Sequence, residues 1–157
     1  MFESSLVEHK SLENNIGTLY LFDCGNVLYK ELWLHRKKLF IEEPHQHSFE
    51  EHYISSSLHP FKALVIYENQ EKLRTHDLLP NEIFHMRKNN PHQLIVANVE
   101  TQSRPLRMIM ETKKESEEKN TIPLDHNLVR IAMEKGMLSD IGWLAENKRF
   151  METLSSL

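Results

Sequence analysis

The sequence predicts an α+β fold: a single domain with one mixed, largely antiparallel sheet of five or six strands, a short N-terminal helix and a C-terminal pair of helices. Three observations favour this fold class. The chain has 157 residues, the length of one domain. Short apolar runs separated by turn residues occupy most of the chain, and an amphipathic helical pattern occupies its C-terminal end. Strands that precede helices, with short loops between them, are less typical of a doubly wound sheet.

The N-terminal region is expected to form a helix and then three strands. Ser5 and Glu8 have the spacing of a capping box, which predicts a helix over residues 6–13. Two apolar runs meet at Cys24-Gly25-Asn26, and a Gly-Asn pair between apolar runs is a turn signal. We therefore expect a β-hairpin, followed by a third short strand that ends before Pro44. The three strands expected here cover residues 18–23, 27–35 and 39–42.

The middle of the chain is expected to alternate between helices and strands. Ser48 and Glu51 form a second capping box, and Pro80 suits the first turn of a helix. A continuous apolar run before Tyr67 is typical of a buried strand. The elements expected here are, in order, a helix over 49–57, a strand over 62–67, a helix over 80–88, strands over 93–99 and 106–112, and a solvated charged loop over 111–120.

The C-terminal end carries the helical pattern. Asp125 is a good N-cap for a first helix, Gly136 is a suitable C′ residue, and Ser139 can cap a second helix. The second helix should carry an aromatic and Met face that includes Trp143, Phe150 and Met151. This face either packs in the core or binds a partner, which would be another protein or a second copy of the chain.

Composition narrows the function. The net charge of −4 argues against a protein held to nucleic acid by bulk electrostatics, although a local basic patch could still bind it. The single cysteine, Cys24, excludes a disulfide within one chain. We find no apolar run long enough to span a membrane and no signal-peptide pattern. These features favour a small cytoplasmic binding or regulatory protein that acts through protein contacts and needs no cofactor.

The segment from Phe22 to Leu28 resembles the first motif of two enzyme families. In haloacid dehalogenase phosphatases, an aspartate in the place of Asp23 is the nucleophile. PIN and NYN ribonucleases have a first strand that ends in such an aspartate, and the run from Asp125 to Gly136 resembles their later motif. The second resemblance implies an α/β PIN-like fold and a nuclease that uses Asp23 and Asp125 with Mg²⁺ or Mn²⁺. No acidic residue is clearly placed for the middle metal ligand of that family.

Two further patterns concern metal or nucleic-acid chemistry. Glu111-Thr112-Lys113 resembles the acidic-X-Lys trio of restriction-type nucleases, and such a trio is also common in a solvated charge run. His45 and His47, with His52 beyond them, could ligate a transition metal. The sequence leaves open whether these histidines form a functional site or bind metal only adventitiously.

Overall fold

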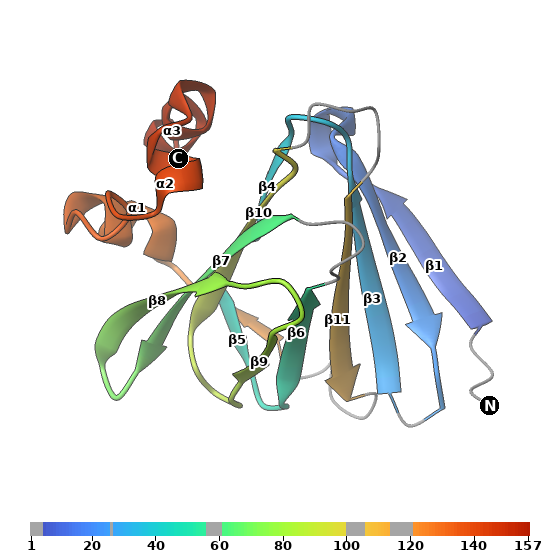
Figure 1. Ribbon diagram of the computed structural model, residues 1–157. Coiled ribbons are helices and arrows are strands. Elements are labelled where there is room, and N and C mark those ends of the chain that lie inside the picture. Colours follow the sequence, from blue (N-terminus) through green and yellow to red (C-terminus); the bar gives the residue numbers. More distant parts are fainter. Residues whose placement is uncertain (1–4, 26, 56–60, 100–105, 114–120) are drawn as a thin grey trace.

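Two antiparallel β-sheets pack face to face in the computed structural model, and short helices lie outside one of them (Figure 1). The structure describes residues 5–25, 27–55, 61–99, 106–113 and 121–157. The first sheet has the strand order β1-β2-β3-β11-β6-β9. The second has the order β12-β5-β10-β7-β8, and β4 also pairs with β10. Every strand pairing among the described residues is antiparallel.

The strands are short, and most follow one another through tight turns. Their bounds are β1 Ser5–Ser11, β2 Gly17–Asp23, β3 Val27–Leu34, β4 Leu39–Ile41, β5 His45–His47, β6 Glu51–Ser55, β7 Lys62–Asn69, β8 Lys72–Leu78, β9 Ile83–Met86, β10 His92–Ala97, β11 Leu106–Lys113 and β12 Thr121–Pro123. A single 3-10 turn, Glu13–Asn15, links β1 to β2.

Two hydrophobic cores hold the layers together. The first lies between the sheets and includes Leu32, Tyr53 and Val65. The second lies between the outer face of the second sheet and the helices, and includes Leu64 and Leu128. Strands β7 and β10 contribute alternate residues to both cores, which explains why they read in the sequence as continuous apolar runs.

The predicted hairpin is confirmed. Strands β2 and β3 pair along their whole length, and the N–H of Cys24 donates to the carbonyl of Val27 at 3.0 Å. Gly25 has a φ of +85°, a conformation that glycine adopts without strain. At the other end of β2, a Cβ on Gly17 would lie 2.0 Å from the carbonyl oxygen of Trp33, so only glycine fits there.

The prediction of largely antiparallel strands is confirmed, but the strands form two sheets and not the single sheet predicted, and three predicted helices are wrong. Residues 6–11 lie in strand β1 instead, because pairing with β2 satisfies their backbone groups, and Glu13 begins the 3-10 turn. Residues 51–55 form β6 and residues 83–86 form β9, and these two strands pair with each other. The carboxylate of Glu82 accepts from the N–H of Leu79 at 2.8 Å, so the segment after Pro80 begins as a turn. The protein is mainly antiparallel β, and the α/β alternative does not describe it.

The C-terminal helices are present but divided differently from the prediction. They are α1 Leu128–Glu134, α2 Gly142–Ala145 and α3 Lys148–Ser155. Asn127 caps α1 in place of Asp125, and Asn147 caps α3 in place of Ser139. Gly136 follows α1 with a φ of +70°, as its C′ role requires. No helix in the described part of the chain is both long enough and apolar enough to cross a membrane.

Candidate metal centre

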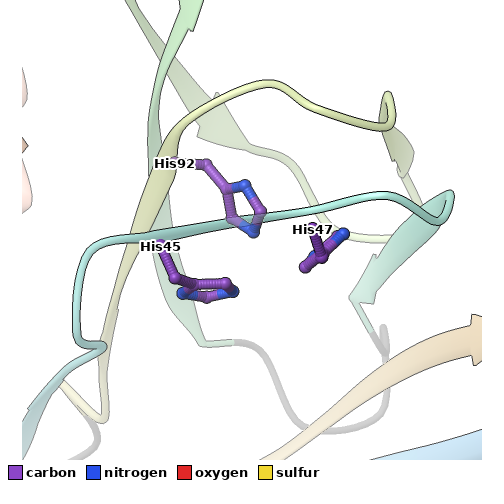
Figure 2. Close-up of side chains that lie close together, drawn as sticks. All are labelled: His45, His47 and His92. Carbon is purple, nitrogen blue, oxygen red and sulfur yellow. The ribbon is translucent and has the colours of Figure 1, made fainter. Parts of the chain in front are cut away.

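Three histidines meet at one end of the second sheet. His45 and His47 are two residues apart on β5, so their side chains share a face. Strand β10 pairs with β5 at a single position, His92 opposite His45, and this pairing brings the third ring alongside. One ring nitrogen from each histidine lies within 4.8 Å of the other two. Figure 2 shows the three imidazole rings facing a common space.

Each of these rings is held by a hydrogen bond from Nδ1 to a backbone carbonyl. The acceptors are the carbonyls of Glu43 for His45 at 2.8 Å, of Phe49 for His47 at 2.9 Å, and of Asn90 for His92 at 2.8 Å. A carbonyl oxygen can only accept, so Nδ1 carries the proton in each ring. In the neutral ring, Nε2 then keeps the lone pair that binds metal.

A buried carboxylate faces two of these nitrogens. Oε1 of Glu51 lies 3.6 Å from Nε2 of His47 and 3.7 Å from Nε2 of His92. These distances are too long for hydrogen bonds. All three atoms are buried without a hydrogen-bond partner in the described part of the chain. Buried polar atoms are nearly always satisfied, so a cluster of unsatisfied nitrogen and oxygen atoms indicates space for an ion.

The pKa shifts at the site have distinct causes. Burial opposes ionisation of Glu51, but His47 and His92 outweigh it and lower the pKa of that carboxyl below its usual range. Burial raises the pKa of Glu42 to about 7, and the nearby Glu51 charge adds to the shift. Burial also lowers the pKa of His45, which favours its neutral form. Glu51 raises the pKa of His47 despite burial, so the site combines an ionised carboxylate with a neutral His45 and a more basic His47.

A cavity opens beside this cluster. Its volume is about 520 Å³, within the range of small-molecule sites. The lining includes two of the clustered histidines and two cations from the first sheet. It consists of Lys10, Lys30, Glu42, Glu43, Pro44, His45, His47, Phe49, Glu51, Thr121 and Pro123.

Solved structures with a similar arrangement of strands identify the architecture. Oxalate decarboxylase from Bacillus subtilis, a protein with Mn(II) centres, matches with a TM-score of 0.53 and 16% identity, over 88% of this chain and 37% of that chain. A structure of the same enzyme at pH 4.6 matches with a TM-score of 0.51 and 16% identity, over 79% of this chain and 34% of that chain. The fold is a cupin-like β-sandwich.

At this level of identity the comparison establishes the fold alone. The chain spans about a third of the length of the decarboxylase. No protein-family model matches the sequence, and no curated protein matches it.

The cupin-like fold does not bring Asp23 and Asp125 together. Asp23 ends β2 and accepts a hydrogen bond from the N–H of Gly25 at 3.0 Å, as part of the hairpin turn. The carboxylate of Asp125 is fully exposed and contacts His126 at 3.0 Å. Strand β2 and helix α1, which begins just after Asp125, lie at opposite ends of the molecule (Figure 1). The side chain of Glu111 lies outside the described residues.

The three residues of the expected partner face have different surroundings. Phe150 is 2% exposed and belongs to the second core. Trp143 is half-buried, and its indole N–H donates to Asp77 at 3.0 Å. Met151 packs against the same core and lines a shallow hollow of about 590 Å³ over α2 and α3. Packing thus accounts for Phe150, while Trp143 and Met151 remain partly exposed.

Sequence reasoning found two of the three clustered histidines. It grouped His52 with them, but the ring of His52 stacks on His85 at 4.6 Å instead. The third histidine of the cluster, His92, was missed because it stands 45 positions beyond His47 in the sequence, and only the pairing of β10 with β5 brings it close. Glu51 stands four residues after His47 and could have been considered as a fourth candidate ligand, but it was assigned to the capping box of a predicted helix.

Proposed function

We propose that this chain is a metal-binding protein of cupin-like fold, in which His45, His47, His92 and Glu51 hold one divalent transition metal ion. The observation that carries the proposal is the shared tautomer of the three rings. Each Nδ1 donates to a backbone carbonyl, so each Nε2 is available as a ligand. A protein that used these histidines only for packing would have no need to orient all three alike.

The donor set indicates the class of metal. Three imidazoles and one carboxylate suit Mn²⁺, Fe²⁺, Co²⁺, Ni²⁺ or Zn²⁺, whereas Mg²⁺ prefers oxygen ligands and water. Four protein ligands leave positions open on a metal that prefers six, and such positions are typical of catalytic sites. A metal bound here would act as a Lewis acid toward an oxygen ligand in the adjoining cavity. The Mn(II) centres of oxalate decarboxylase from Bacillus subtilis, whose fold is similar, are compatible with this class of metal.

Protein contacts through the C-terminal helices stay a prediction. Trp143 and Met151 still offer a partly exposed surface for a partner, but the buried Phe150 cannot contribute to it. The nuclease alternative has no support in the structure, because the carboxylates of Asp23 and Asp125 do not lie together and cannot share a metal ion.

The proposal is tested by metal titration. The protein is stripped with a chelator, and Co²⁺, Zn²⁺ and Mn²⁺ binding is measured by calorimetry. We expect one ion per chain, and we expect His47→Ala and Glu51→Ala each to weaken binding by at least about tenfold. The matched control is His52→Ala, which removes an imidazole outside the cluster and should bind like the wild type.

Two results would count against the proposal. The first is a wild-type chain that binds none of the three metals when the protein is folded by circular dichroism. The second is equal loss of affinity in His47→Ala and in the His52→Ala control, because this would show that binding is not confined to the cluster.

A further inference from the structure

We propose that the cavity beside the metal centre binds a small organic carboxylate, with a carboxylate oxygen on the metal and the negative charge held by Lys10 and Lys30. This inference rests on the proposed function, because it takes the metal as one of the two anchors. It goes beyond that function by giving the chemical class of the ligand.

The cavity has two chemically different walls. Strand β5 of the second sheet and strand β6 of the first sheet supply the candidate ligands, His45, His47 and Glu51. Two other strands of the first sheet supply the cations, Lys10 from β1 and Lys30 from β3. Candidate metal ligands and two cations therefore line one space of about 520 Å³.

Strand register explains why both lysines point into the sandwich. Lys10 lies opposite Leu19 on β2, and Lys30 lies opposite Leu21. Residues directly opposite in a sheet share a face, and Leu19 and Leu21 are two apart, so all four side chains lie on one face. Leu19 packs against the core between the sheets, which identifies this face as the inner one.

Lysine on an inner face is unusual, and both lysines line the cavity, where Lys10 is exposed and Lys30 is half-buried. Burial raises the pKa of Glu42 and lowers that of His45, and the charge of Lys30 opposes the first shift and adds to the second. This agrees with the place of Lys30 in the same cavity lining as Glu42 and His45.

The balance of charge favours an anion once a metal is bound. At full ionisation, Lys10 and Lys30 carry two positive charges and the three lining glutamates carry three negative ones. The cavity alone thus has a net charge of about minus one, and a divalent ion changes it to about plus one. A carboxylate would compensate this excess charge and would also supply the oxygen ligand that an open metal position accepts.

The remaining lining limits the size and character of the ligand. Pro44, Phe49 and Pro123 contribute apolar surface between the charged walls. Such a lining suits a short carbon skeleton better than a fully hydrated inorganic anion. We therefore expect an organic carboxylate of a few carbon atoms.

The experiment uses the Co²⁺-loaded protein, because the visible spectrum of bound Co²⁺ reports on its ligands. Malonate is the probe, and malonamide is its uncharged control with the same carbon skeleton. We expect malonate to change the spectrum saturably and malonamide to leave it unchanged. Lys30→Met and Lys10→Met should each raise the Kd for malonate by about tenfold while leaving Co²⁺ affinity within about twofold.

The matched control is Lys72→Met, which removes an exposed lysine of β8 that does not line the cavity. It should bind malonate like the wild type. If Lys30→Met does not fold, the malonate affinity of Lys10→Met is sufficient for the test. Lys10 is exposed, so its replacement should not affect folding.

The outcomes separate this inference from the proposed function. If Co²⁺ binds but malonate does not change its spectrum, the carboxylate inference fails and the metal centre stands. Equal binding of malonamide, or unchanged malonate affinity in both lysine variants, would likewise overturn the inference. If the folded protein takes up no Co²⁺, both the metal centre and the inference built on it fail.

Discussion

Replacing His92 with leucine should abolish metal binding at little cost to the stability of the metal-free protein. His92 is fully buried, and its Nε2 has no partner among the described residues. An unsatisfied buried polar atom costs about 1–3 kcal/mol, whereas the bond from Nδ1 to the carbonyl of Asn90 contributes about 1 kcal/mol. These two changes oppose each other. We therefore expect the free energy of unfolding of the metal-free variant to change by less than about 2 kcal/mol.

The metal-dependent part of the stability should behave differently. With free metal at about 100 times its Kd, binding stabilises the folded wild type by about 2.7 kcal/mol. For a domain of this size, each kcal/mol raises the melting temperature by about 2–4 °C, so saturating metal should raise it by roughly 5–11 °C. The His92→Leu variant should show no such rise.

Differential scanning calorimetry with and without Zn²⁺ measures both quantities in one series. His52→Leu is the control, because it makes the same chemical change at a histidine outside the cluster. A rise in melting temperature of wild-type size in His92→Leu would refute the assignment of His92 as a ligand. A metal-free His92→Leu variant destabilised by more than about 4 kcal/mol would refute the argument that its Nε2 is unsatisfied.

Three further predictions follow from the same structure. Metal affinity, measured by calorimetric titration, should fall by about tenfold or more from pH 7.5 to 5.5. Glu51 raises the pKa of His47 despite burial, so protons compete with the metal for Nε2 of His47 as the pH falls. An affinity that does not change with pH would contradict this. Phe150→Ala should lower the free energy of unfolding, measured by urea denaturation, by about 3–5 kcal/mol, because Phe150 is a core residue. A loss below about 1 kcal/mol would contradict its place in the core. Gly17→Ala should destabilise the protein by several kcal/mol, because its Cβ would overlap the backbone of Trp33, whereas Gly142→Ala meets no neighbour and is the control.

Local sequence signals predicted the hairpin and the apolar strands but not the long-range pairing. The Gly-Asn corner after Asp23 is a signal of a few residues, and the structure confirms it. The capping boxes at Ser5 and Ser48 were equally local, yet both segments form strands. A sheet partner distant in the sequence offers every backbone group a hydrogen bond, and this outweighs about 1 kcal/mol from a helix cap.

The candidate site was only half visible in the sequence for the same reason. His45 and His47 are two residues apart, and their shared face follows directly from a strand. His92 joins them only because β5 and β10 pair, and no spacing rule connects residues so far apart. Glu51 was assigned to a helix cap, so its place at the start of β6 beside His47 could not be anticipated.

The most direct test of the metal centre is a crystal structure of the metal-loaded protein, with anomalous scattering measured at the absorption edge of the bound metal. We predict one strong anomalous peak per chain, bonded to a ring nitrogen of His45, His47 and His92 at about 2.0–2.1 Å and to a carboxylate oxygen of Glu51 at about 2.0–2.2 Å. A loaded crystal with its peak at the stacked pair His52 and His85, or with no peak between the three clustered rings, would contradict the proposed centre.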